Sequence, residues 1–231
     1  MAWQISLHPE VESWFLAVCA DDPESGDLIE LALDHLSEEG PAAGRPLVDR
    51  VKGSRYHNMK ELRPASTGRS EVRMLFAFDP AREAIPRCRR QIRKLAGVVL
   101  RGNPLGRQAL RGAPGCVGGA AMTAKLTKWS EVEAKARSAD SRTETERATA
   151  REHARERHDA YLRGHQLAEI RKSIGLTQTK LASILGISQA RVSKIEQGKV
   201  AGIDTIRAYV SALGGSVDVV VTLGDRTWKV A

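Results

Sequence analysis

The stretch that decides the fold of the second half of this chain runs from Leu176 to Gly198 and reads LTQTKLASILGISQARVSKIEQG. Thr177 stands where its hydroxyl can cap a helix over 178–185, and Gly186 can adopt the left-handed conformation that ends such a helix. Ser188 can cap a second helix that runs to Gln197. The residues that this arrangement turns inward are Leu181, Ala182, Leu185, Ile187, Val192 and Ile195. Two short helices joined by a glycine turn are typical of a helix-turn-helix.

Burial of those apolar residues turns the polar side chains between them outward. Gln and Arg can make bidentate contacts with base edges, and Ala can contact a thymine methyl group. A side chain at a helix N-terminus, such as Gln178, and exposed Lys and Arg residues can hold backbone phosphates. The residues that we expect to contact DNA are Gln178, Lys180, Ser188, Gln189, Ala190, Arg191, Ser193 and Lys194. The alternative is a small helical domain with an ordinary polar face.

The stretch from Gln166 to Leu213 closely resembles the Xre/Cro family of helix-turn-helix repressors. The resemblance implies a dimer that binds a palindromic operator in double-stranded DNA. Glu196 matches the Ile-Glu-x-Gly ending of the family's motif, where it is generally structural, so it stays outside the expected DNA contacts.

The charge of the chain is divided unevenly along its 231 residues. Residues 1–85 hold 9 Lys and Arg against 15 Asp and Glu, whereas residues 86–121 hold 8 basic residues and no acid. Residues 122–231 are basic again, with 19 against 13. Such asymmetry indicates separate modules.

The first module, residues 1–85, reads as mixed α/β. Strand-like alternation covers 3–7, 56–62 and 72–78, and apolar residues recur at helical spacing over 11–16 and 28–36. The segments Gly44–Arg63 (GRPLVDRVKGSRYHNMKELR) and Val72–Pro80 (VRMLFAFDP) resemble the RelE superfamily of toxins, in its phage Gp49-like, HigB-type branch.

That resemblance implies a metal-free enzyme that cleaves mRNA on the ribosome, with basic side chains on the sheet around the scissile phosphate. Lys60, Arg63 and Arg73 match positions where the family keeps basic residues, so they are the candidate catalytic groups. The alternative is that they are ordinary solvated charges on strand faces.

Residues 86–121 show no regular pattern. Seven glycines, three prolines and no aromatic residue predict a segment that cannot bury enough apolar surface to fold. Toxins of this group should continue here with a strand and a helix bearing Trp and Tyr. We interpret the segment as the product of a frameshift that truncated a toxin and fused it to an antitoxin starting near Met122. The nucleotide sequence of codons 80–122 tests this interpretation.

The remaining residues resemble an antitoxin of HigA type, a family that carries this DNA-binding domain. Ser130-Glu131-Val132-Glu133 can open a long polar helix as a capping box, and 217–230 predicts a β-hairpin turning at Gly224-Asp225. The predicted fold class is α+β: an incomplete RelE-like module (1–85), a disordered linker (86–129), a long helix (130–163), an all-α helix-turn-helix domain (164–214) and a hairpin (215–231).

Three hypotheses about function follow. The first is an antitoxin that represses its own promoter behind an inactive toxin module, and the second is a working toxin–antitoxin fusion whose mRNA and ribosome activity is inhibited in cis. The third is an interaction protein whose 130–162 helix covers a separate HigB-type toxin. Three scattered cysteines and the absence of any membrane-length apolar run favour a cytoplasmic protein, and His153 and His158 have poor metal spacing, so no cofactor is expected.

Overall fold

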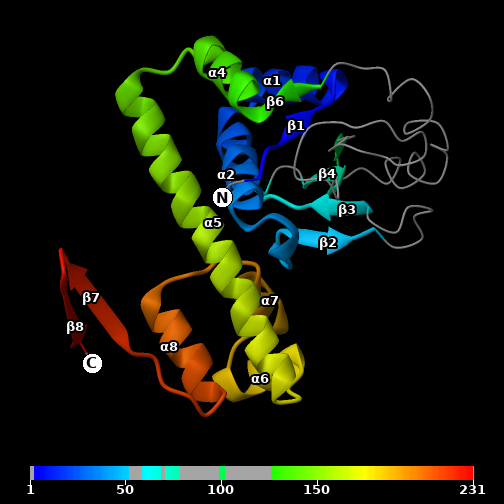
Figure 1. Cartoon of the computed structure of the whole chain (residues 1–231). Coiled ribbons are helices and arrows are strands. Elements are labelled where there is room, and N and C mark those ends of the chain that lie inside the picture. Colours follow the sequence, from blue (N-terminus) through cyan, green and yellow to red (C-terminus); the bar gives the residue numbers. More distant parts are fainter. Residues whose placement is uncertain (1–2, 52–58, 69–70, 79–98, 102–125, 231) are drawn as a thin grey trace. The chain divides into compact units, whose positions relative to one another are not determined.

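The computed structural model of the chain describes residues 3–51, 59–68, 71–78, 99–101 and 126–230 (Figure 1). It divides into two compact units, Met1–His158 and Asp159–Ala231. Helices and several small sheets occur together, which confirms the predicted α+β class. Most of the predicted linker, together with the proposed frameshift region, lies outside the described residues.

Two helices form the first layer of unit 1. Helix α1 (Pro9–Asp21) begins after His8, whose Nδ1 accepts a hydrogen bond from the backbone N–H of Glu10. Helix α2 (Pro23–Glu39) begins after Asp22, whose carboxylate accepts one from the backbone N–H of Ser25. Both helices have proline in the first position, where its fixed φ suits the helix and its missing N–H costs nothing.

The second layer is a four-stranded antiparallel sheet in the order β2-β3-β4-β5. Its strands are β2 (Val48–Arg50), β3 (Met59–Leu62), β4 (Val72–Ala77) and β5 (Val99–Arg101). Leu62 pairs with Met74 and Lys60 with Phe76. Strand β5 lies in the segment for which the sequence predicts no regular structure, because its pairing with β4 depends on distant residues and leaves no local pattern.

The core of unit 1 lies between the helices and one face of the sheet. The buried side chains that form it include Leu7, Val11, Phe15, Leu28, Leu33, Leu36, Leu62, Met74 and Phe76. A short 3-10 helix, η1 (Gly40–Ala42), connects α2 to the sheet. Helical spacing in α1 and α2 and alternation in β3 and β4 account for this burial.

Residues 126–158, which we call the arm, also belong to unit 1. Strand β6 (Thr127–Lys128) pairs antiparallel with β1 (Ser6–Leu7), and helix α4 (Trp129–Ala139) packs against α1. The arm ends with the first half of α5 (Glu144–Ser173). The predicted single helix over 130–163 is therefore wrong: residues 140–143 separate two helices.

The capping box predicted at Ser130 is also absent. Helix α4 begins one residue earlier, after Lys128, and has no side-chain cap. The burial of Trp129, only 7% exposed, fixes that start instead. A capping box does form at the next helix, because Thr143 and Glu146 exchange hydrogen bonds between side chain and backbone in both directions.

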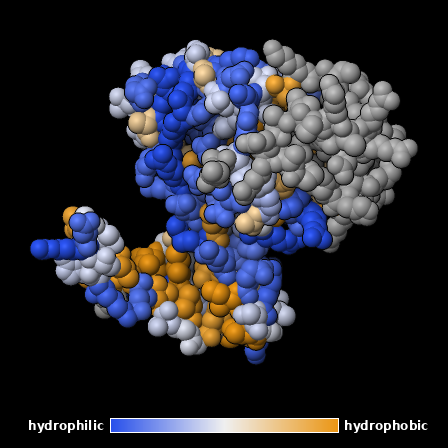
Figure 2. Space-filling view, in the orientation of Figure 1, coloured by the Kyte–Doolittle hydropathy of each residue, from blue (hydrophilic) through white to orange (hydrophobic). Residues whose placement is uncertain are grey.

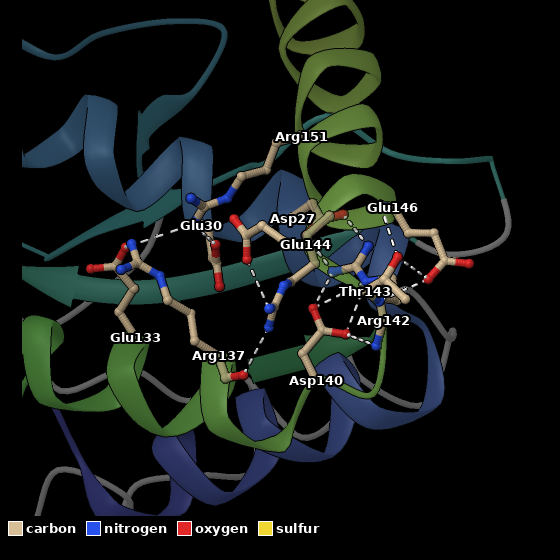
Figure 3. Close-up of polar contacts among 11 residues, drawn as sticks. Asp27, Glu30, Glu133, Arg137, Asp140, Arg142, Thr143, Glu144, Glu146 and Arg151 are labelled. Atoms are coloured by element: carbon tan, nitrogen blue, oxygen red, sulfur yellow. Dashed lines mark hydrogen bonds and ion pairs between the residues drawn. The ribbon is translucent and has the colours of Figure 1, made fainter.

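Ion pairs join the arm to α2 (Figure 3). Arg142 donates to both oxygens of Asp27, at 2.8 and 2.9 Å, and also binds Asp140. Arg151 donates to Glu30 at 2.9 Å. Charged residues of the basic second half of the sequence thus meet the acidic first module inside one folded unit.

Unit 2 contains the end of α5 and three further helices, α6 (Gln178–Leu185), α7 (Gln189–Glu196) and α8 (Ile203–Ala212). Their common core consists of Leu167, Leu181, Ala182, Val192, Ile195 and Tyr209. Strands β7 (Val219–Leu223) and β8 (Arg226–Val230) form the predicted hairpin, turning at Gly224 with φ +58°.

Several large apolar side chains of unit 2 remain exposed (Figure 2). They are Ile170, Ile174, Ile184 and Ile203 on the helices and Val220, Val221, Leu223, Trp228 and Val230 on the hairpin. Among the described residues, no helix combines the length and the apolar character that crossing a membrane requires.

Candidate nucleic-acid interface

The helix-turn-helix forms as its sequence predicts. The Thr177 hydroxyl accepts a hydrogen bond from the backbone N–H of Lys180 at 3.1 Å, and the Ser188 hydroxyl accepts one from that of Arg191 at 3.2 Å. Gly186 ends α6 in the left-handed region, with φ 65° and ψ 28°. The three signals that the sequence offered for the start, end and restart of the helices are confirmed.

Two glycines hold α5 close to the end of α7. A Cβ on Gly198, which has φ +73°, would lie 2.4 Å from the carbonyl oxygen of Ala160, and a Cβ on Gly164 would lie 2.7 Å from that of Ile195. Both distances are far below van der Waals contact. The α7 helix therefore sits directly on the α5 backbone, which fixes its orientation within unit 2.

The outward face of α7 carries the residues that the sequence assigns to DNA. Gln189, Ala190, Arg191 and Lys194 are exposed, and Ser193 is half-buried. Ser188 and Lys180 are also exposed, whereas Val192 and Ile195 of the opposite face are buried. The structure thus exposes six of the eight candidates on α6, α7 and the turn between them, and Ser193 and Gln178 are half-buried.

The Gln178 side chain is expected to contact a phosphate, but in the structure its amide also bonds to two other side chains of the motif. Its Nε2 donates to the Glu196 carboxylate at 2.8 Å, which fixes the amide orientation, because a carboxylate can only accept. Its Oε1 consequently accepts from Nε2 of Gln189 at 2.6 Å. Gln178 therefore orients Gln189, the first residue of α7.

Glu196 is the centre of a buried polar network beneath this face. Arg171 donates to it through Nε and Nη2, at 2.6 and 2.9 Å, and Oη of Tyr209 donates to it at 2.7 Å. Burial alone would raise the pKa of Glu196, but the hydrogen bonds from Arg171, Gln178 and Tyr209 hold that pKa below its usual value. The pKa of Tyr209 is raised by burial and by its bond to Glu196.

The sequence analysis set Glu196 apart as structural but missed its partners Arg171 and Tyr209. A signal for Arg171 exists: it lies four residues after Leu167, so it occupies a core position of α5. A charged residue at such a position requires a buried partner. No local pattern identifies which acid supplies it, since Glu196 is 25 residues away.

In unit 1, Arg63 and Arg73 lie together, and both bind the same carboxylate. Arg63 donates to Glu61 through Nε at 2.9 Å and lies 3.1 Å from Asp49, while Arg73 donates to Glu61 at 3.4 Å. Glu61 is largely buried, with a side chain only 12% exposed. The two guanidinium groups are thus partly neutralised by carboxylates of the sheet.

Lys60 is not brought together with those arginines. Neighbouring residues of a strand point to opposite faces, and paired residues of adjacent strands point to the same face. Lys60 therefore shares a face with Leu62 and Phe76, whereas Glu61 and Arg73 lie on the other. Its Nζ is 5.1 Å from the ring centroid of Phe78, and burial together with Arg50 lowers its pKa.

Within the described residues, no group of three or more His, Cys, Asp or Glu side chains is arranged to hold a metal ion. The described residues of unit 1 offer its ion-paired arginines and Lys60, and those of unit 2 offer an exposed polar helix on a rigid base.

Two protein-family models match the chain. The helix-turn-helix family matches residues 167–220, and the family of phage-derived Gp49-like proteins matches residues 20–86. The first covers α6, α7 and α8 entirely, and the second covers α2 and the described strands β2, β3 and β4.

Relatives of both kinds occur in Mycobacterium tuberculosis. The putative toxin HigB2 is 67% identical over 64 residues, which are 28% of this chain and 32% of HigB2. The putative antitoxin HigA3 is 44% identical over 103 residues, which are 43% of this chain and 90% of HigA3. The chain thus spans about a third of the toxin relative and most of the antitoxin relative.

One solved structure, described as "Induced DNA bending by unique dimerization of HigA antitoxin", is 45% identical over 28% of this chain and 88% of that chain, with a TM-score of 0.25.

Proposed function

Since the chain belongs to the HigA family of antitoxins and carries a HigB-like region in its first half, we propose that it represses its own promoter by binding DNA through α7. The observation that supports this most strongly is the exposed row formed by Gln189, Ala190 and Arg191 on a capped helix. Gln189 and Arg191 read base edges, and Ala190 contacts a thymine methyl group. The protein acts in the cytoplasm.

The other candidates hold the DNA backbone. Lys180 and Lys194 are exposed cations at the two ends of the motif, and Ser188 and Ser193 offer hydroxyl groups beside them. Such contacts fix the position of a protein on the duplex but carry no sequence information. Gln178 adds a phosphate contact at the N-terminus of α6 while it orients Gln189.

The test compares Arg191→Ala with Arg226→Ala, which removes an exposed arginine of β8 outside the motif. Gel-shift titrations use DNA from upstream of the gene and a scrambled duplex of equal length. Arg191→Ala should weaken binding to the promoter by about 1–3 kcal/mol and leave the scrambled duplex nearly unaffected. Equal losses on both duplexes would reduce Arg191 to a phosphate contact, and no loss on either would refute the proposed face.

The protein binds its operator as a homodimer. One α7 helix reads only a few base pairs, and two helices related by a twofold axis read the two halves of a palindrome. Footprinting should therefore show two protected half-sites about 10 bp apart, centre to centre. A single protected half-site, with a monomer in light scattering of the complex, would contradict the dimer.

The arm gives the protein a second partner, a HigB-type toxin. It packs on α1 and pairs with Asp27 and Glu30 of α2, the helix that lies within the Gp49-like match, so its surface already fits a helix of that class of protein. Co-purification with tagged HigB2 tests this partnership.

The second candidate function is a working fusion whose ribosome-dependent mRNA cleavage is inhibited in cis. The presence of Lys60, Arg63 and Arg73 favours this function. Two observations argue against it: both arginines bind Glu61, and the sheet register places Lys60 on the opposite face. Cleavage of mRNA on ribosomes by the purified chain, abolished by Arg63→Ala or Arg73→Ala, would establish this activity. We expect no cleavage.

A further inference from the structure

The arm covers the helices α1 and α2, which we call the helix pair, with an apolar centre. The Trp129 ring meets Phe15 edge to face at 5.3 Å between centroids, and its Nε1 donates to Asp34 at 3.0 Å. Val132 is fully buried and Ala136 is 4% exposed. A buried tryptophan whose polar atom is satisfied is the usual anchor of a protein interface.

Complementary charges surround this centre. Lys135 of the arm lies 2.5 Å from Glu12, Arg142 binds Asp27 through two bonds, and Arg151 binds Glu30. In each of these pairs the cation belongs to the arm and the acid to the helix pair. The helix pair therefore selects a basic partner surface with an apolar centre, and the arm selects an acidic one.

The contact is also built to open. A polar cavity of about 770 Å³ lies within it, lined by Cys19, Asp27 and Glu30 on one side and by Arg142 and Arg147 on the other. The side chains of Lys135 and Arg151 remain 55% and 39% exposed, so each of their ion pairs contributes little to stability. An interface that is apolar only at its centre resembles an exchangeable association more than a domain core.

Residues 20–86 match the Gp49-like family, so a separate toxin of that family presents a surface related to α2. We propose that the helix pair occupies in cis the surface through which the arm binds a separate HigB-type toxin, so that the closed chain is a weak antitoxin. The proposal rests on the toxin partnership stated above. The toxin-like region is then a built-in competitor.

The experiment opens the contact from the side of the helix pair and leaves the arm unchanged. Glu12→Lys places a cation opposite Lys135, and Glu10→Lys is the matched control, because Glu10 lies on the same helix with a side chain 83% exposed. Glu30→Gln is a second, milder variant that weakens the contact to Arg151. Amide hydrogen exchange of residues 126–139 reports opening of the arm, and immobilised HigB2 of M. tuberculosis measures toxin binding.

Glu12→Lys should speed exchange in the arm and bind HigB2 at least about tenfold more tightly than the wild type, because apparent affinity scales with the fraction of open molecules. Glu30→Gln should change both in the same direction and by less, since it removes one partly exposed ion pair and adds no repulsion. Glu10→Lys should behave as the wild type. The charge swap Glu12→Lys/Lys135→Glu should restore slow exchange, which shows that the change is local and not a general loss of fold.

Two negative results have different meanings. If a variant opens the arm and HigB2 still does not bind, the toxin partnership itself is refuted. If the wild type binds HigB2 as tightly as the opened variants do, the partnership stands and occupation in cis is overturned.

Discussion

The buried ion pair between Arg171 and Glu196 makes the stability of unit 2 depend on single side chains. Their side chains are 7% and 6% exposed, and every polar atom of the carboxylate has a donor. A buried ion pair adds little over a well-packed apolar pair, but removal of one partner leaves the other charge uncompensated.

Glu196→Gln should therefore lower the free energy of unfolding of unit 2 by about 3–5 kcal/mol, since the Arg171 charge loses its counter-ion. Urea denaturation followed by circular dichroism measures the change. Glu169→Gln is the control, because Glu169 pairs with Lys172 on the surface, where both side chains are more than half exposed. A loss as small as that of the control would contradict the importance of the buried pair.

The same residue predicts a pH dependence. The pKa of Glu196 in the folded protein lies below its usual value of 4.5, so its contribution to stability is complete above that value. As the pH falls from 4.5 through the folded pKa, the carboxylate takes up a proton and the contribution is lost. Over this range the wild type should lose more stability than Glu196→Gln. Parallel curves for the two proteins would refute the assignment.

Gln178 provides a test of specificity as distinct from affinity. Gln178→Ala removes the acceptor that orients Gln189 as well as the phosphate contact, so it should weaken binding to both duplexes. The loss on the promoter should exceed the loss on scrambled DNA by about 1 kcal/mol, the net value of one hydrogen bond. Gln197→Ala is the matched control, because that amide donates to Ser193 at the other end of α7. Equal effects of the two variants would mean that the contact between Gln178 and Gln189 has no role in readout.

At the scale of elements, the two glycines around α7 differ in what a side chain would meet. Gly186 has φ +65° and open space around its missing Cβ, whereas Gly198 has φ +73° and the α5 backbone at 2.4 Å. Gly186→Ala should cost about 1–2 kcal/mol for the left-handed conformation alone. Gly198→Ala should cost more, since α5 and α7 must also move apart. Thermal unfolding of the two variants compares them, and equal losses would contradict the close packing.

The elements that the sequence predicts well are those with local signals. Thr177, Gly186 and Ser188 act within one turn of the residues they cap or end, and the hairpin at Gly224 is a two-residue connection. Burial of Val192 and Ile195 follows from helical spacing. These local signals are enough to predict which face of α7 points outward.

The elements that the sequence does not reveal depend on residues far along the chain. Strand β6 exists because Thr127 pairs with Leu7, and α4 begins at Trp129 because that ring packs on Phe15. The start of α5 was in principle readable, because Thr143-Glu144-Thr145-Glu146 is a capping-box sequence. The sequence also identifies Lys60, Arg63 and Arg73 as basic residues of the sheet. Only the pairing of the strands shows that Lys60 lies on the opposite face from the two arginines.

At the scale of the molecule, each unit has its own core, around Phe15 and Leu33 in unit 1 and around Leu181 and Tyr209 in unit 2. We expect two unfolding transitions in calorimetry, since a chain with separate cores departs from two-state behaviour. Glu196→Gln should shift one transition, and Val132→Ala, which removes two buried methyl groups from the arm, should shift the other. A single transition that both variants shift would mean that the units unfold together.

The pairing of β6 with β1 has a consequence for dosage. The helix pair and the arm are synthesised on one polypeptide, so every molecule contains one of each. The connecting chain therefore sets the local concentration of the arm at the helix pair. A complex of two separate proteins falls apart when its components become scarce. This pairing does not, and its occupancy stays the same however few copies a cell contains.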